Sequence, residues 1–337
     1  MALLLIEGFE DYGTSTTGNL SSTIVGERYN ATSALRLNTG RLTGYSCGCY
    51  GSATDIITPP LTTNSTIVVG GAFRYLGTPT ASAIISLYDG ATLGVNLSYD
   101  GTNLVIKRGA TSLGSVATAL TAAVWIYIEL KVLCNSSTGT ATLKVNNSTV
   151  LTLTSQNTQA GGHAWHDIVD FFFQGSATGS WDDIYILDGS GSVNNDFLGP
   201  QKVLCMYPTG DSGSEQWTTS TGATHYNLVN EQVEDADTTY VVNSAPGQLD
   251  MFAYGGLSGT GTIAGIQINT AVRETDTNSH SLITRVISGG TTSDDSGQGV
   301  ANTSYTNRRR LLDTDPNTSA AWTLAALNAA TFGFIAG

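Results

Sequence analysis

Carboxyl side chains are the first candidates for chemistry in this sequence, because two of them at a suitable separation can hydrolyse a glycosidic bond. Acids two or four residues apart on one strand would share a face. Glu129 instead stands alone among apolar residues, and Asp167 and Asp170, three residues apart, are expected on opposite faces of a strand. A phosphate-binding loop of the G-x-x-x-x-G-K-[ST] type is also missing from the sequence. The sequence therefore predicts a protein that is not an enzyme.

Aromatic residues in loop-like surroundings are the next candidates. Tyr45, Tyr50, Trp165 and Trp217 stand among glycine and polar residues, where an aromatic ring can stack on a sugar. Tyrosine and tryptophan are also enriched at protein interfaces. Trp165, Tyr45 and Tyr50 are thus predicted to bind glycan or to line a subunit interface, and the sequence leaves both readings open.

The cysteines do not follow a metal-binding pattern. Cys47 and Cys49 are separated by one residue, which is tighter than the usual two-residue gap of zinc sites, while Cys134 and Cys205 lie far along the chain. We expect free thiols and no cofactor, apart from the calcium ion considered below.

Charge is sparse and mostly negative. Only 12% of the 337 residues are charged, and the net charge is −13. Nucleic-acid binding relies on clustered Lys and Arg, so this balance excludes it. The one basic cluster, Arg308–Arg310, is expected in a strand that pairs with acidic neighbours, with a docking patch for an acidic subunit as the alternative. The opening MALLLIEGFE is too short to span a membrane and predicts a buried first strand of a soluble protein without membrane insertion.

The chain reads as all-β. Apolar runs alternate with Gly, Asn, Ser and Asp clusters, which is typical of sandwiches. Asp100-Gly101 and Asn146-Asn147 are predicted hairpin turns. Ile126–Val132 alternates with a period of two, which predicts a strand with Glu129 and Lys131 on a wet face. Residues 320–330 alone favour a short helix. Two domains are expected, a sandwich over residues 1–195 and a second, smaller β-sandwich over residues 200–337.

Three tracts carry a resemblance to a known family. Trp181-Asp182-Asp183-Ile184-Tyr185-Ile186 resembles the last strand of concanavalin-A-like (laminin-G-like) jelly rolls. The segment EDADTTYV and the stretch 315–333 are similar to a two-domain structural protein of tailed-bacteriophage virions. The resemblance implies an N-terminal jelly roll whose first strand pairs beside its last.

The same resemblance implies a role in the virion. It favours a tail or neck appendage, such as a fibre or tail-associated protein, assembled in the host cytoplasm with other virion proteins. A head decoration protein and a lectin-like module that binds host polysaccharide are the alternatives. A homo-oligomer of closed symmetry is also expected, because the charge density is low and the apolar tail 330–337 would be a liability in water.

In related jelly rolls, an acid on the last strand meets the first strand, sometimes around a structural calcium ion. Pairing of these strands would bring Glu7 or Glu10 toward Asp183 and supply oxygen ligands for Ca²⁺. In the competing reading, Asp183 accepts hydrogen bonds from backbone amides or hydroxyls and no ion is needed.

Overall fold

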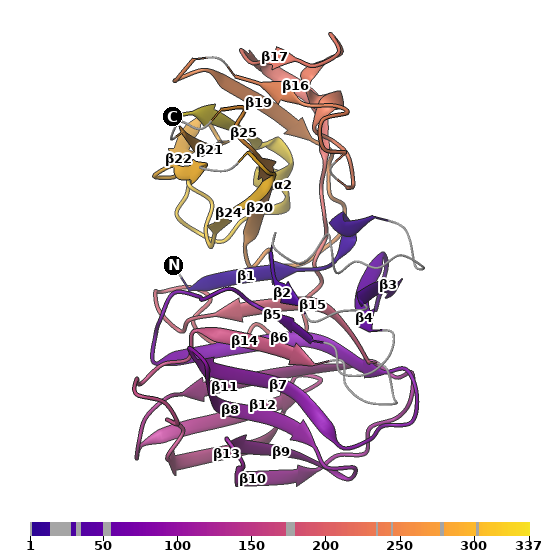
Figure 1. Ribbon diagram of the computed structural model, residues 1–337, viewed down its shortest axis with the longest axis vertical. Coiled ribbons are helices and arrows are strands. Elements are labelled where there is room, and N and C mark those ends of the chain that lie inside the picture. The colour runs from indigo at the N-terminus through magenta and orange to yellow at the C-terminus, as the bar shows by residue number, and fades with distance from the viewer. Residues whose placement is uncertain are drawn as a thin grey trace. The chain divides into compact units, whose positions relative to one another are not determined.

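The computed structural model describes residues 2–13, 28–31, 35–49, 55–172, 179–233, 235–243, 245–276, 280–300 and 303–337. The chain divides into two compact units, Met1–Leu204 and Cys205–Gly337, and both consist almost entirely of strands (Figure 1). The predicted all-β class is confirmed.

The first unit contains an eight-stranded sheet, counted over the described residues. Its strand order is β13-β12-β11-β6-β15-β4-β3, and β1 pairs with β15. The strands are β1 (Leu3–Glu7), β3 (Leu35–Thr39), β4 (Tyr45–Cys49), β6 (Thr66–Tyr75), β11 (Ile126–Leu133), β12 (Gly139–Val145), β13 (Ser148–Gln156) and β15 (Gly179–Leu187). The 3-10 helix η1 (Glu10–Tyr12) follows β1.

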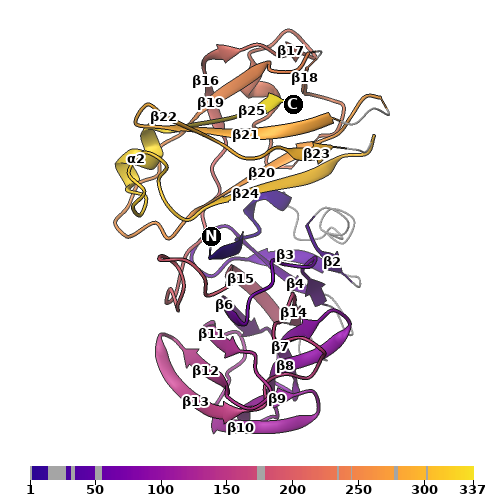
Figure 2. The same cartoon turned by 90° about the vertical axis from the view of Figure 1, so that its left-hand side faces the viewer.

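A seven-stranded sheet faces it (Figure 2), again counted over the described part of the chain, with the order β10-β9-β8-β7-β14-β5-β2. Its strands are β2 (Asn30–Ala31), β5 (Asp55–Ile57), β7 (Ser82–Asp89), β8 (Thr92–Tyr99), β9 (Asn103–Arg108), β10 (Thr111–Ala117) and β14 (Ile168–Phe172). Apolar side chains from both sheets, Trp181 among them, form one core between the layers. This arrangement confirms the predicted concanavalin-like sandwich.

Local sequence signals account for the turns of this unit. Asp100 accepts hydrogen bonds from the amides of Thr102 (2.8 Å) and Asn103 (2.7 Å), which closes the β8–β9 hairpin. Asn146 and Asn147 adopt φ of 49° and 67° between β12 and β13, as a turn of mirror-image type requires. β1 pairs with β15 from Leu3 opposite Leu187 to Glu7 opposite Ile184. These predictions are confirmed.

The outer side of β11 differs from the prediction. Glu129 is fully buried, and it accepts hydrogen bonds from the Tyr185 hydroxyl (2.5 Å) and the Gly199 amide (2.8 Å). The predicted wet face is wrong at this position because residues 196–203 return across the eight-stranded sheet. Lys131 bonds Asp196 at 3.1 Å on the same side. This return also explains why the first unit ends at Leu204 rather than near residue 195.

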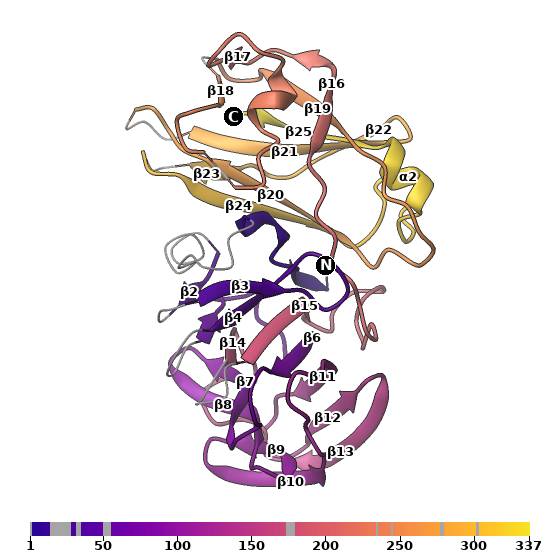
Figure 3. The ribbon, with the colours of Figure 1, turned by 90° about the vertical axis from the view of Figure 1, so that its right-hand side faces the viewer.

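In the second unit, the described residues form a six-stranded sheet, β16-β19-β25-β21-β22 with β23 beside β21, and a ribbon of β20 and β24 (Figure 3). The strands are β16 (Pro208–Glu215), β17 (Thr218–Thr219), β18 (Val241–Val242), β19 (Leu249–Tyr254), β20 (Ile266–Val272), β21 (His280–Ser288), β22 (Thr291–Asp294), β23 (Gln298–Val300), β24 (Thr306–Leu312) and β25 (Thr331–Ala336). Ile266, Ile268 and Leu312 of the ribbon pack against a core that contains Val286 and Phe332. This is the smaller sandwich that the sequence predicts.

Two further predictions, a short helix and an exposed apolar tail, can be compared with the structure of this unit. Helix α2 (Leu324–Ala329) lies where a helix was expected, and the Thr323 hydroxyl caps it by accepting from the Ala326 amide. The apolar tail does not lie open to water, because β25 is inserted between β19 and β21. The tail therefore gives no reason to expect an oligomer, and oligomerisation stays a prediction.

The basic cluster lies on β24, which pairs with β20. Its partners are mostly backbone carbonyls rather than acids: Arg310 donates to the carbonyls of Thr284 and Ser293 (2.5 and 2.8 Å). Within the described residues, none of the helices is long and apolar enough to cross a membrane.

Candidate functional site

A row of side chains crosses the whole seven-stranded sheet of the first unit. Directly opposed residues in an antiparallel sheet point to the same face, and successive pairs here link all seven strands. We call this set the transverse row: Ser112, Lys107, Asn96, Ser86, Asp170, Ile57 and Asn30.

The transverse row points away from the core. Along each strand, alternate residues face opposite ways. Val95 and Leu97 flank Asn96, and Val169 and Phe171 flank Asp170, and these four side chains belong to the core between the sheets. The transverse row therefore lies on the outer face of the sheet, opposite the core.

Asp170 of β14 lies in the row between Ser86 and Ile57. It is 2% exposed, and its Oδ1 atom has no hydrogen-bond partner among the residues that the structure describes. The Tyr88 hydroxyl forms a hydrogen bond with the Asp170 carboxyl and another with Ser86. Burial, and then the charge of Asp55, raise the pKa of Asp170 to about 8. Asp170 thus keeps its proton at neutral pH and presents an uncharged acid on this face.

His166 adds a second group of the same kind. Its ring packs over Gly94 of β8, where a Cβ would collide with the imidazole. Gly94 lies two residues from Asn96, so His166 is on the same outer face. Its Nδ1 atom is buried without a partner in the described part of the chain, and burial lowers the pKa of His166 to about 4. The imidazole is therefore neutral at physiological pH.

The loop that carries His166 also holds Trp165. The Trp165 ring stacks on His163, with the ring centroids 4.3 Å apart and the planes at 12°. Asp89 at the end of β7 fixes His163, because its carboxylate lies 2.8 Å from Nδ1 and accepts from the backbone amide at 3.0 Å. Trp165 is half-buried. The predicted aromatic residue thus borders the sheet face beside His166.

The other aromatic candidates do not join it. Tyr45 packs against the core of the first unit, and Tyr50 lies outside the described residues. Trp217 belongs to the second unit, where its indole donates to the Gln248 carbonyl (3.0 Å) and its ring meets Phe334 edge-on.

The predicted calcium ligands have partners within the protein. Glu7 is buried and accepts from two tyrosine hydroxyls (3.0 and 3.1 Å) and the Phe9 amide (2.9 Å). Asp183 is bonded by the Arg41 side chain (2.7 and 2.8 Å) and the Val203 amide (2.8 Å). Burial, and then the charge of Asp182, raise the pKa of Glu10 to about 9. Over the described ranges, no group of three or more His, Cys, Asp or Glu side chains is arranged to hold a metal ion. The calcium site stays a prediction.

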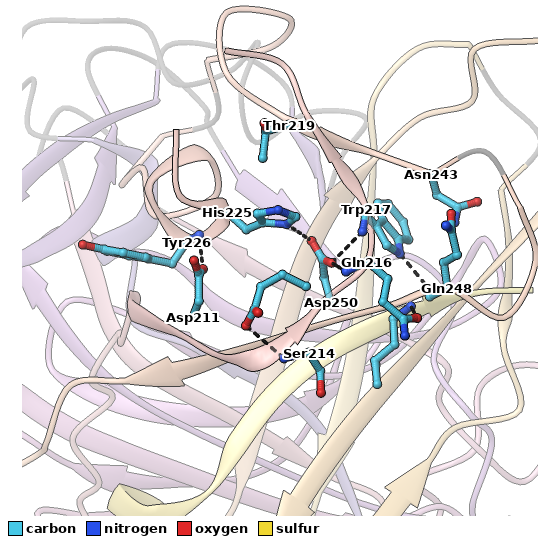
Figure 4. Close-up of polar contacts among 12 residues, drawn as sticks. Asp211, Ser214, Gln216, Trp217, Thr219, His225, Tyr226, Asn243, Gln248 and Asp250 are labelled. Carbon is cyan, nitrogen blue, oxygen red and sulfur yellow. Dashed lines mark hydrogen bonds and ion pairs between the residues drawn. The ribbon is translucent and has the colours of Figure 1, made fainter. Parts of the chain in front are cut away.

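The second unit has a different polar cluster, drawn in Figure 4. Asp250 of β19 is fully buried, and its Oδ1 accepts from the amides of Gln216 (2.7 Å) and Trp217 (2.9 Å). Its Oδ2 lies 2.7 Å from Nδ1 of His225, in the 3-10 helix η2 (His225–Leu228). Both carboxylate oxygens are satisfied, so Asp250 anchors two loop segments to the sheet.

The transverse row is the part of the site that sequence reasoning missed. Asp170 and Asp55 lie on neighbouring strands, and a search along one strand cannot pair them. One signal was present: Asp170 is the only charged residue in the apolar run IVDFF, at a position that alternation turns outward. The partner strands could not be read from the sequence.

No family model and no curated relative matches the sequence. Solved structures that resemble it include an endo-β-1,4-glucuronan lyase from the fungus Trichoderma reesei (10% identity, TM-score 0.37, covering 51% of this chain and 95% of that one). A galectin-like protein of unknown function from Bacillus subtilis aligns with 9% identity and a TM-score of 0.38 (55% and 98% covered). A carbohydrate esterase from the Shiga toxin-encoding bacteriophage phi24B aligns with 12% identity and a TM-score of 0.36 (53% and 100% covered).

These comparisons contradict one prediction. A protein that is not an enzyme was expected, yet the similar structures include a polysaccharide lyase and a carbohydrate esterase. The expectation is therefore withdrawn. Likenesses of this degree assign no activity, ligand or partner to the chain.

Proposed function

We propose that the first unit binds a polysaccharide laid across the outer face of its seven-stranded sheet. The observation that carries this proposal is a line of accessible polar groups on one face, Lys107, Ser112 and Asn30, with the half-buried ring of Trp165 at its border. These side chains can bond the hydroxyl groups of a sugar chain, and the apolar body of the indole ring can pack against a sugar ring.

The chemistry of the face favours an uncharged sugar chain. Asp170 and His166 are both neutral at physiological pH for the reasons given above, so neither attracts an ion. Lys107 is half-buried in the row, and Ser112 and Asn30 are exposed at its two ends. The protein carries a net charge of −13, which repels polyanions at long range. An extended, neutral polysaccharide crossing the strands is the ligand class that we propose.

A binding measurement with matched lysine variants tests the proposal. Lys107→Ala combined with Trp165→Ala changes the face, and Lys131→Ala changes the outer side of the other sheet. Affinity electrophoresis in hydroxyethylcellulose, laminarin or dextran should show retardation of the wild type, with alginate as the anionic comparison. We expect the double variant to bind about ten-fold more weakly, or about 1.4 kcal/mol, and Lys131→Ala to bind normally. Equal losses in both variants would contradict the proposal.

A second candidate function, a component of a tailed-phage virion, is favoured by the tracts 181–199, 231–241 and 315–333, which resemble such a protein. A tail or neck appendage is the preferred location, with head decoration as the alternative, and a sugar-binding face would then meet host polysaccharide. Mapping the chain in an electron-microscopy reconstruction of the particle tests this. Absence from purified virions would refute it.

A further inference from the structure

The last segment of the first unit lies across the outer side of the eight-stranded sheet, and we call residues 196–203 the strap. Three backbone amides of the strap donate to side chains on β11 and β15. These bonds run from Leu198 to the Tyr185 hydroxyl (3.1 Å), from Gly199 to Glu129 (2.8 Å) and from Val203 to Asp183 (2.8 Å). In addition, the Arg41 guanidinium donates to the Gln201 carbonyl. Polar contacts thus hold the strap along its length.

The strap contributes little to the hydrophobic core of the first unit. Among the residues that the structure describes, no strap residue belongs to the apolar cluster between the sheets or packs against it. The Phe197 ring instead contacts the Lys144 ammonium, which lies 4.4 Å from its centroid. Asp196 and Lys131 bond at 3.1 Å, but their side chains are 65% and 30% exposed, and such a pair stabilises little. The strap can therefore leave the sheet without opening the core.

The groups beneath the strap are suited to water as well as to the strap. Glu129 and Tyr185 are polar, yet they are 0% and 2% exposed while the strap covers them. The Oε2 atom of Glu129 has no hydrogen-bond partner among the described residues, so the covered state leaves this buried oxygen unsatisfied, which costs free energy. Water would satisfy the same oxygen once the strap has left. Release therefore exchanges hydrogen bonds within the protein for hydrogen bonds with water.

We propose that the strap is a releasable segment, which leaves the eight-stranded sheet while both sheets of the first unit stay folded. A segment with few apolar contacts opens at a lower free energy than the core does. Release adds the length of the strap to the chain that joins the two units. Fully extended, the strap would lengthen that connection by up to about 27 Å, at about 3.4 Å for each residue. The end of the first unit thus contains a device that sets the reach of the connection.

Limited digestion of the full chain with trypsin measures the open state. Lys202 is exposed within the strap, and a protease cuts a segment that has left the fold more readily than a bound one. Cleavage after Lys202 gives two fragments that mass spectrometry identifies. The rate is followed at urea concentrations well below the unfolding midpoint.

Two matched glycine variants separate release of the strap from general destabilisation. Gly199 has a φ of 74°, which alanine adopts only with strain, whereas the released chain accepts alanine freely. A Cβ at Gly199 would lie no closer than 3.5 Å to Asn147, so Gly199→Ala acts through the backbone of the bound strap. Gly109→Ala places the same strain, at a φ of 55° with open space around it, in the turn between β9 and β10.

We expect the wild type to be cut after Lys202 at a rate that hardly changes with urea, because local release exposes little surface. Gly199→Ala should be cut about ten-fold faster, as the cost of a left-handed conformation predicts, and Gly109→Ala should be cut like the wild type. Equal acceleration in both variants would overturn the proposal, as would a wild type that is cut there only through global unfolding.

Hydrogen exchange of the wild type decides the question if Gly199→Ala does not fold. The amides of residues 198–203 should exchange faster than those of β11 beneath them, because release of the strap exposes the first set alone. Equal exchange rates in the two segments would reject the proposal.

Discussion

Two buried carboxyl groups, one in each unit, differ in how fully the surrounding protein hydrogen-bonds them. Asp170 in β14 and Asp250 in β19 both lie on inner strands of a sheet and are almost inaccessible to water. Asp250 receives two backbone amides and His225 at 2.7–2.9 Å. Asp170 receives Tyr88 and keeps one oxygen without a partner among the described residues.

The difference separates an acid whose two oxygens are both bonded from an acid that is bonded only in part. A buried carboxylate is expensive unless donors surround it, and the second unit provides those donors from its own chain. The first unit leaves Asp170 protonated instead and does not use its full bonding capacity. Leaving one buried oxygen of Asp170 unsatisfied among the described residues costs the first unit stability at this point.

The largest expected effect is on the structural side of this contrast. Asp250→Ala leaves two buried amides and His225 without their acceptor, so we expect the second unit to lose roughly 3–5 kcal/mol of stability, as when one partner of a buried pair is removed. Urea unfolding followed by tryptophan fluorescence measures this loss. Asp294→Ala, which removes an exposed partner of Arg285 (2.6 Å), is the control and should cost under about 1 kcal/mol. Similar losses in the two variants would contradict the anchoring role.

The next effect concerns the pH dependence of Asp170. Its pKa in the folded protein, about 8, is above the ordinary value of 3.8. The native state therefore keeps a proton that the unfolded chain has released, and this contribution to stability is present below pH 4 and is lost as the pH rises to 8. The stability of Asp170→Asn relative to the wild type should therefore be greater at pH 8.5 than at pH 5. Urea unfolding midpoints at both pH values test this. An equal difference between variant and wild type at the two pH values would show that Asp170 is ionised like an ordinary acid.

A smaller effect of opposite sign is expected from His166. Its pKa of about 4 is below the ordinary value of 6.5, so its contribution is present above pH 6.5 and is lost as the pH falls to 4. His166→Gln should therefore lose less stability than the wild type between these values. Thermal melts at pH 7 and pH 4.5 provide the comparison, with the exposed His163 replaced in the same way as a control. If the melting temperature of His166→Gln falls between pH 7 and pH 4.5 as much as that of the wild type, the buried, neutral state of His166 is refuted.

The smallest effect is expected at Glu7 and Asp183, which resemble Asp250 because protein donors already surround them. Chelator should shift the melting temperature by less than about 1 °C, because a ligand that binds only the native state must raise its stability. Calcium that raises the melting temperature in the wild type but not in Asp183→Asn would restore the predicted ion site.

Local chemistry allowed most of the fold to be predicted, and long-range pairing set the limit. The turns at Asp100 and Asn146 depend on residues next to each other, and both were found where expected. Glu129 was misplaced because its cover comes from residues 196–203, far along the chain. The acid pair of Asp55 and Asp170 was missed for the same reason, since strand order decides which side chains share a face.

The pairing of β1 with β15 has a consequence for biosynthesis. The strand that contains Leu3 cannot pair until Leu187 has left the ribosome. The hairpins of β7 to β10 can form as soon as their own residues have been synthesised. Closing so long a loop costs entropy before any contact repays it. During that wait the apolar strand Leu3–Ile6 exposes a free edge, which is the kind of surface that aggregates or recruits chaperones. The first unit should therefore fold late and slowly, with its N-terminal strand the last to become protected from hydrogen exchange.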